Sequence, residues 1–404
     1  MILPIKINVI EKSFFLLLVI AFLRPILTAL SGKVPLPIHL IIPLVISYGL
    51  LFLLLLSYND IKWNLSSLLI ILFSCYVITS LMWGSDLRNV IELIIALSFY
   101  FFGRTFVRDQ KSGQLLITVM IIGNILPITT SAVMMFFDVS KSYVQYGMSM
   151  ERKLGIFGGI HTAAHTMIFF SYIYALFLTF KSNTNSVLSY IANSIFILTI
   201  YTVWNTYVRS AFFGMLSFWM FYLFFFKKRN FVIVLIILIG LGTWKLSTVD
   251  SIFWQADARG RERNLETASS GRTEIWKHQI KLFAKMPFYL QIMGNGLGSE
   301  SKSSKTRIAD DKIWASHNDF LSLLMTLGVA GLLLYCTVII SVIWEILFLS
   351  NQRHAKITYL AIIISFMSTA MITNAGINRF EIHHIFWLLL GCSKIFCSSE
   401  PKNL

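Results

Sequence analysis

The residue types best suited to chemistry in this chain are a histidine and two arginines beside apolar segments. His317 stands within Trp-Ala-Ser-His-Asn-Asp at 314–319, and a long apolar run follows directly. An imidazole ionises near neutral pH and can accept a proton from a hydroxyl group, so His317 is a candidate general base. The alternative is a histidine that only caps or packs against a helix start.

Two arginines are candidates for anion binding. Arg209 is the only Lys, Arg, Asp or Glu between Lys181 and Lys227. A lone charge at membrane depth is costly unless it pairs, binds an anion or extends to the membrane surface. Arg272 follows Gly271 at the predicted N-terminus of a helix, where a guanidinium and backbone N–H groups together favour phosphate. A solvated loop arginine is the alternative there.

Four residues around His317 could support a site. Asn318 and Asp319 could orient the imidazole or bind sugar hydroxyls, although both also suit an ordinary helix start. Gly328 and Gly331 lie deeper in the same apolar run. At about 100° per residue they fall near the helix face that carries His317, and they would let a neighbouring helix approach closely.

A group of charged and titratable residues precedes the last apolar segment. It contains Arg379, Glu381, His383 and His384, and Arg379 is a further supporting candidate. No metal-ligand spacing accompanies the two histidines. The four cysteines, at positions 75, 336, 392 and 397, lie in or beside apolar segments without a Cys-x-x-Cys pair. We therefore expect no metal site, no cofactor and no disulfide framework.

Composition determines the class of protein. The chain has 404 residues, of which 56% are hydrophobic and 13% charged, and its mean hydropathy is +0.72. A soluble protein could not bury so much apolar surface, so we expect a polytopic membrane protein. In this class much of the net charge of +15 serves to orient the protein, because Lys and Arg favour cytoplasmic connections. We therefore expect membrane lipids and no nucleic acid as partners. Lys6 and Lys12 precede a first apolar segment that reads as a retained signal anchor.

The hydropathy pattern predicts an all-α fold with about twelve transmembrane helices. Short connections on the side of the N-terminus hold more Lys and Arg than those on the other side, which predicts cytoplasmic termini. Residues 1–249 then form helices one to nine, residues 250–316 form one large periplasmic loop, and residues 317–404 form helices ten to twelve. The predicted spans are roughly 13–30, 36–57, 66–83, 88–103, 114–137, 160–180, 187–206, 208–226, 230–249, 317–349, 356–376 and 382–397.

The predicted loop contains two recognisable segments. From Arg272 to Pro287 the pattern favours a short amphipathic helix, because its apolar residues lean to one side, as in a helix that lies on a membrane surface. Residues 294–298, Gly-Asn-Gly-Leu-Gly, favour a flexible, tightly turning backbone. No strand–glycine–helix unit surrounds these glycines, which argues against a dinucleotide site.

These stretches together resemble a known family, the bacterial O-antigen ligase and O-antigen polymerase superfamily. Ser-Gly-Arg-Thr-Glu-Ile-Trp at 270–276, Gly-Asn-Gly-Leu-Gly at 294–298, and His317-Asn318 with Gly328-x-x-Gly331 occur in that order. Thr-x-x-Arg-Ser at 206–210 precedes them. The span count, the loop position and the chain length also resemble the family. The family's usual Ser-Arg-Gly around the first arginine reads Val-Arg-Ser here.

The resemblance implies a multi-pass glycosyltransferase of the bacterial inner membrane with its active site at the periplasmic face. Such enzymes take an undecaprenyl-pyrophosphate-linked glycan as donor and need no metal or nucleotide sugar. Carried onto this chain, His317 matches the candidate base, while Arg209 and Arg272 match the arginines that bind the pyrophosphate.

The resemblance leaves the acceptor open. Polymerases extend a lipid-linked repeat unit and could bind a chain-length regulator, whereas ligases transfer the glycan to the lipid A core. The Ser-Gly-Arg-x-x-x-Trp and His-Asn-Asp-Phe-Leu versions favour a repeat-unit polymerase, with an O-antigen ligase as the alternative. A flippase or transporter of lipid-linked sugars is a more distant alternative, because it would need polar residues along several spans.

Overall fold

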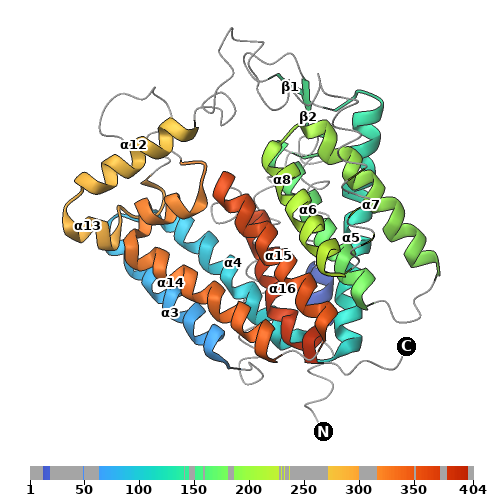
Figure 1. Cartoon of the computed structure of the whole chain (residues 1–404), viewed down its shortest axis with the longest axis horizontal. Coiled ribbons are helices and arrows are strands. Elements are labelled where there is room, and N and C mark those ends of the chain that lie inside the picture. Colours follow the sequence, from blue (N-terminus) through green and yellow to red (C-terminus); the bar gives the residue numbers. More distant parts are fainter. Residues whose placement is uncertain are drawn as a thin grey trace.

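The computed structural model describes residues 12–18, 63–140, 142–144, 151–157, 160–180, 186–226, 272–299, 316–349, 352–373 and 380–398, with single positions at 49, 229, 232 and 236. Over these residues the chain forms a bundle of long helices with one short β-hairpin (Figure 1). Its helices are α3 (Leu65–Thr79), η2 (Ser80–Trp83), α4 (Leu87–Phe106), α5 (Gln110–Phe136), α6 (Ile160–Phe180), α7 (Ser186–Thr206), α8 (Arg209–Phe226), α12 (Arg272–Lys285), α13 (Phe288–Met293), α14 (Asp319–Leu349), α15 (Arg353–Ile372) and α16 (Phe380–Ser398).

Among the described residues, eight helical segments are long and apolar enough to cross a membrane: α3 with η2, α4, α5, α6, α7, α8, α14 and α15. Exposed apolar side chains such as Leu72 (52%), Ile197 (66%) and Ile340 (62%) lie on their outer faces, where lipid would cover them. The prediction of a multi-pass helical membrane protein is therefore confirmed. The bounds of α6 coincide with the predicted span 160–180.

The predicted count of twelve spans stays a prediction. The span predicted at 382–397 corresponds to α16, which is helical but not among the eight. The spans predicted at 36–57 and 230–249 fall almost wholly outside the described residues, and only the start of the span predicted at 13–30 lies within them. Within 12–18 the chain is helical, and Phe14 stacks on Phe106 of α4 with ring centroids 4.7 Å apart.

One element departs from the predicted all-α fold. Strands β1 (Ser142–Val144) and β2 (Glu151–Lys153) pair in antiparallel fashion between α5 and α6. Lys153 Nζ lies 2.7 Å from Asp138 Oδ1, so an ion pair joins the hairpin to the end of α5. Three-residue strands are too short to give a clear alternating pattern, which is why the sequence did not indicate them.

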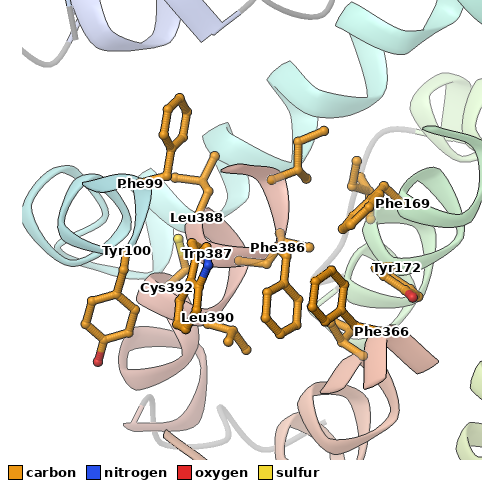
Figure 2. Close-up of a cluster of buried hydrophobic side chains, with 14 of the residues drawn as sticks. Phe99, Tyr100, Phe169, Tyr172, Phe366, Phe386, Trp387, Leu388, Leu390 and Cys392 are labelled. Atoms are coloured by element: carbon orange, nitrogen blue, oxygen red, sulfur yellow. The ribbon is translucent and has the colours of Figure 1, made fainter. Parts of the chain in front are cut away.

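Helix α16 lies within the core and packs along α4. Phe386, Trp387 and Leu388 are fully buried there, beside side chains of α6 and α15 (Figure 2). The two helices approach closely because each has a glycine at the contact: a Cβ at Gly391 would overlap Tyr100 O, and one at Gly103 would overlap the backbone of α16.

Contacts near the helix termini show the relative directions of α6, α8, α15 and α16. Phe180 of α6 packs on Phe396 of α16, and Phe226 of α8 packs on His354 of α15. The C-termini of α6, α8 and α16 therefore lie beside the N-terminus of α15. The other termini of these four helices lie at the end of the bundle that carries α12 and α13 (Figure 1). We call these the opposite end and the α12 end.

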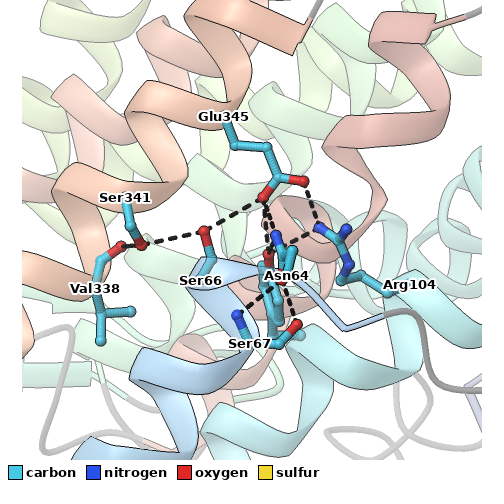
Figure 3. A network of polar contacts seen from close by, with 8 residues as sticks. Asn64, Ser66, Ser67, Arg104, Val338, Ser341 and Glu345 are labelled. Carbon is cyan, nitrogen blue, oxygen red and sulfur yellow. Dashed lines mark hydrogen bonds and ion pairs between the residues drawn. The ribbon is translucent and has the colours of Figure 1, made fainter.

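A buried polar network joins three helices at the opposite end (Figure 3). Arg104 Nη1 donates to Glu345 Oε1 at 2.7 Å, and the same nitrogen donates to Tyr100 Oη at 2.9 Å. Glu345 Oε2 accepts from Asn64 Nδ2 and from Ser66 Oγ. Asn64 also caps α3, since its Oδ1 accepts from Ser67 N at 2.8 Å. The network thus fixes the last turns of α4 and α14 against the first turn of α3.

Candidate active site

His317 lies just before α14 and is exposed. Its φ is 49°, a left-handed conformation that is uncommon outside glycine and that costs of order 1–3 kcal/mol. The preceding residue is fixed by α12, because Trp276 Nε1 donates to Ser316 O at 2.7 Å. Ser316 Oγ in turn donates to Asn318 O at 2.7 Å. Neighbours on both sides therefore hold His317 in this strained conformation.

Asn318 is the N-cap of α14. Its Oδ1 accepts from Leu321 N at 3.0 Å, and its carbonyl accepts from Ser322 N at 2.9 Å. This is the ordinary capping role that the sequence left open. Asp319 is fully buried in the first turn, where a carboxylate is favoured by the helix dipole. Both residues thus stabilise the helix start that presents His317.

The predicted helix face shared by His317, Gly328 and Gly331 is wrong. His317 lies outside the helix, and Gly328 breaks α14 with φ 67° and ψ −172°. A helical rotation cannot be counted across such a break. Gly331 follows in the second part of α14, where a Cβ would lie 3.1 Å from Tyr76 Cε1 of α3. The two glycines therefore serve different purposes: Gly331 lies where α14 contacts α3, and Gly328 permits the break beside α13.

The glycine-rich segment 294–298 holds this break. Asn295 N donates to Met325 O at 3.0 Å and Gly296 N donates to Thr326 O at 2.8 Å, so two carbonyls that precede the break are satisfied. A Cβ at Gly328 would overlap Ile292 O. The turn is tight, as predicted, since the φ values of Gly294, Gly296 and Gly298 are 79°, 88° and 86°.

Two aromatic side chains, from α3 and η2, also bond to the backbone around this break, and the sequence did not reveal these contacts. Tyr76 Oη donates to Leu327 O at 2.8 Å, and Trp83 Nε1 donates to Met293 O at 3.1 Å. Each aromatic donor thus reaches a backbone carbonyl more than 200 residues away in sequence. Such long-range pairs leave no local pattern.

Helix α12 begins at Arg272 and ends just before Pro287, as predicted. Arg272 Nη1 donates to Ile372 O, the last residue of α15. Trp276 lies one helical turn further along α12 and reaches Ser316. Residues four apart share one helix face, so a single face of α12 joins the end of α15 to the start of α14. The buried side of α12 centres on Gln279 rather than on apolar residues, since Ile280 is exposed.

Arg209 is the first residue of α8 and is half-buried. Further along α8, a Cβ at Gly214 would contact both Ile168 of α6 and Thr369 of α15, so these three residues lie at one level of the bundle. At about 1.5 Å per residue, Arg209 lies about 7 Å nearer the α12 end, and Ile372 lies about 4–5 Å nearer it. Arg209 and Arg272 therefore both lie beside the C-terminus of α15.

The structure thus brings three of the sequence candidates together at the α12 end: Arg209, Arg272 and His317. Guanidiniums can bind a doubly charged phosphate ester, and an exposed imidazole can accept a proton from a hydroxyl. Arg379 lies outside the described residues, and the side chain of Glu381 does too.

Comparison with known proteins finds a similarity for the segment that contains these residues. Residues 194–336 match the family model described as O-Antigen ligase. This segment, about a third of the chain, is similar to O-antigen ligases. All three converging residues lie in it, together with α12, the glycine-rich segment and the break in α14. No curated protein matches the chain.

The match and the helices together establish the general type of protein. The chain is a multi-pass membrane protein, and the match over residues 194–336 supports an O-antigen ligase or polymerase type of function in surface polysaccharide biosynthesis. The family segment includes α8, α12 and α13 and reaches beyond the break in α14. The matching sequence therefore contains Arg209, Arg272 and His317, whereas the α15 carbonyl that Arg272 contacts lies outside it.

Proposed function

We propose that the chain transfers a glycan from undecaprenyl pyrophosphate to a sugar hydroxyl at the periplasmic face of the inner membrane, as a repeat-unit polymerase. One observation carries the proposal. A single face of α12 places Arg272 at the end of α15, beside Arg209, and fixes the residue before His317. Anion-binding groups and a proton acceptor are thereby brought to one end of the bundle.

The arginines suit the pyrophosphate of the donor. A guanidinium has five N–H donors, and the bond from Arg272 to Ile372 O orients the group at the end of α15. Arg209, at the N-terminus of α8, adds a second positive charge beside the backbone N–H groups of a helix start. Together they would stabilise the negative charge that develops on the leaving pyrophosphate.

The proposed reaction is a direct displacement. The hydroxyl oxygen of the acceptor sugar forms a bond to the anomeric carbon, and the bond from that carbon to the pyrophosphate oxygen breaks. The hydroxyl proton passes to the imidazole of His317, and the electron pair of the broken bond leaves with the lipid pyrophosphate. Attack opposite the leaving group inverts the anomeric carbon. No metal is required, because the arginines neutralise the leaving group.

The distribution of charge supports a periplasmic site. Basic residues of short connections gather at the opposite end of the bundle, including Arg108, Lys111, Arg353 and Lys356. Cytoplasmic connections carry such an excess of Lys and Arg. The α12 end would then face the periplasm, where lipid-linked glycans are assembled into long chains.

Gene deletion followed by gel analysis of lipopolysaccharide tests the proposal and separates it from the alternative. Loss of a repeat-unit polymerase leaves core carrying a single repeat unit. Loss of an O-antigen ligase leaves bare core and accumulates lipid-linked polymer. Unchanged lipopolysaccharide with loss of another surface polysaccharide would show that the enzyme polymerises that polysaccharide instead. Unchanged surface polysaccharides of every kind contradict the proposal.

The role of His317 has its own test with purified enzyme and lipid-linked donor. Removal of a general base commonly lowers the rate about 10²–10⁴-fold. His317→Ala should therefore abolish measurable transfer while donor binding persists, since the arginines bind the donor. Substantial transfer by this variant would leave His317 with a structural role only.

A further inference from the structure

A pair of histidines on α6 lies at the same end of the bundle, and neither the sequence candidates nor the family segment includes it. His161 and His165 are one helical turn apart, with ring centroids separated by 6.1 Å. His165 is buried, at 2% exposure, and His161 is half-buried. A buried imidazole near the terminus of a membrane helix calls for an explanation beyond packing.

The tautomer of His165 is determined by its hydrogen bond. Nδ1 lies 2.6 Å from His161 O. A carbonyl oxygen can only accept, so Nδ1 carries the hydrogen, and in the neutral ring Nε2 carries the lone pair. His165 therefore presents a hydrogen-bond acceptor at Nε2, held in orientation by the backbone of its own helix.

The face of α6 that carries these histidines is directed toward α8 and α15. Ile168 and Tyr172 continue the same stripe, at spacings of three and four residues. Ile168 borders Gly214 of α8, and Tyr172 Oη lies 2.7 Å from Ser365 Oγ of α15. His161 and His165 therefore extend a stripe that is already packed between these two helices.

This stripe lies at the same level of the bundle as the candidate site. Measured from the level of Ile168, His165 lies about 4–5 Å and His161 about 10 Å nearer the α12 end, because each helical residue rises about 1.5 Å. On the same scale Arg209 lies about 7 Å nearer that end, between the two histidines. The C-terminus of α15, to which Arg272 bonds, is level with His165.

We propose that His165 is a further substrate-contacting residue, whose Nε2 accepts a hydrogen bond from a hydroxyl of the transferred glycan. A sugar hydroxyl is the donor that a glycan offers, and a group at the level of the pyrophosphate-binding arginines would meet the sugar next to the pyrophosphate. The inference rests on the proposed glycosyl transfer. His317 takes the proton of the attacking hydroxyl, and His165 orients the sugar.

Two amide substitutions test the contact because each replaces one ring nitrogen. His165→Asn keeps a donor near Nδ1, and so keeps the bond to His161 O, but lacks a group at Nε2. His165→Gln places an amide near Nε2 and loses the donor at Nδ1. A role in substrate binding makes Gln the better replacement, whereas a purely structural role makes Asn the better one.

The measurement is transfer by purified full-length enzyme over a range of lipid-linked donor concentrations, with thermal unfolding measured in parallel. A lost hydrogen bond to substrate weakens binding roughly two- to tenfold. We expect His165→Asn to unfold like the wild type and to raise the apparent KM by that factor, with kcat nearly unchanged. His165→Gln should keep a KM nearer the wild type. His354→Asn, at the opposite end, is the control and should leave KM unchanged.

The outcomes separate the two proposals. A wild-type enzyme that transfers no glycan overturns both. A wild-type enzyme that transfers glycan, an inactive His317→Ala variant, and an unchanged KM in His165→Asn would overturn the role of His165 alone. Equal impairment of the Asn and Gln variants, with lowered thermal stability in both, likewise assigns His165 to structure and leaves glycosyl transfer standing.

Discussion

Arg104 and Glu345 form an ion pair inside the helix bundle although 241 residues separate them in sequence. Both side chains are almost fully buried, at 2% and 7% exposure. Three neighbours, Asn64, Ser66 and Tyr100, complete the hydrogen bonds of the carboxylate. A charge left alone in such a place is far more costly than the pair, because both charges have lost their water.

We therefore expect single substitutions of this pair to be more harmful than a double one. Arg104→Met and Glu345→Gln each leave an unbalanced group, and breaking a buried pair costs about 3–5 kcal/mol. Arg104→Met combined with Glu345→Leu should recover much of that loss. Thermal unfolding of the detergent-purified variants measures the effect. A double variant less stable than either single one would contradict this expectation.

Arg272→Lys separates substrate binding from helix capping. Lysine keeps the positive charge and can still donate to Ile372 O, but it lacks the planar fork that binds two phosphate oxygens. We expect normal membrane levels and at least a tenfold loss of transfer, and Arg209→Ala should behave similarly. Activity of purified enzyme, normalised to folded protein, is the readout. Full activity in Arg272→Lys would show that the residue acts only by capping α15.

Trp276→Phe tests the support of His317. The substitution keeps an aromatic ring but removes the donor to Ser316 O, at a cost of about 1 kcal/mol. Because His317 follows Ser316 directly, we expect transfer to fall more steeply than stability. Lys277→Ala, an exposed neighbour on α12, is the matched control. If both variants transfer glycan at the wild-type rate, the α12 contact does not position the histidine.

Gly328→Ala should destabilise the protein strongly. The left-handed φ of 67° disfavours any side chain, and a Cβ would overlap Ile292 O of the adjoining segment. We expect a loss of at least about 2 kcal/mol, seen as a lower unfolding temperature. Val329→Ala, one residue further along α14 and exposed, should remain close to the wild type. Equal unfolding temperatures for the two variants would be inconsistent with the break.

The orientation in the membrane can be read from two exposed lysines. Lys285 lies at the α12 end and Lys394 near the opposite end, and both side chains are exposed. In intact cells with a permeable outer membrane, a thiol reagent that cannot cross the inner membrane should label Lys285→Cys and not Lys394→Cys. Wild-type labelling gives the baseline of the native cysteines. The reverse pattern would place the site in the cytoplasm.

Local features of the fold were predictable from the sequence because they depend on neighbouring residues. The bounds of α6 follow from an apolar run of membrane length, and the start and end of α12 follow from Gly271, Arg272 and Pro287. The candidate residues Arg209, Arg272 and His317 were also predicted, since lone charges and histidines beside apolar segments are conspicuous. The structure adds that they converge at one end of the bundle.

The remaining features depend on contacts between distant segments. In an apolar run Gly328 reads as a residue for helix packing, and only the nearby carbonyl of Ile292 reveals that it breaks the helix. The ion pair between Arg104 and Glu345 and the hydrogen bond from Tyr76 to Leu327 O join distant segments. The sequence around each of these residues therefore does not predict them. Trp276 could have been noticed, because it lies one turn from Arg272 on the same helix face.

The break at Gly328 determines which part of α14 has to cross the bilayer. The 21 residues from Val329 to Leu349 extend about 31 Å as a helix, close to the thickness of the hydrocarbon layer, so this part alone can cross it. The nine residues from Asp319 to Leu327 are surplus to the crossing, and most of their side chains are buried against protein. These nine residues therefore need not be apolar enough to face lipid. Polar residues such as Ser322 and Thr326 can lie near the candidate site without obstructing insertion of the span.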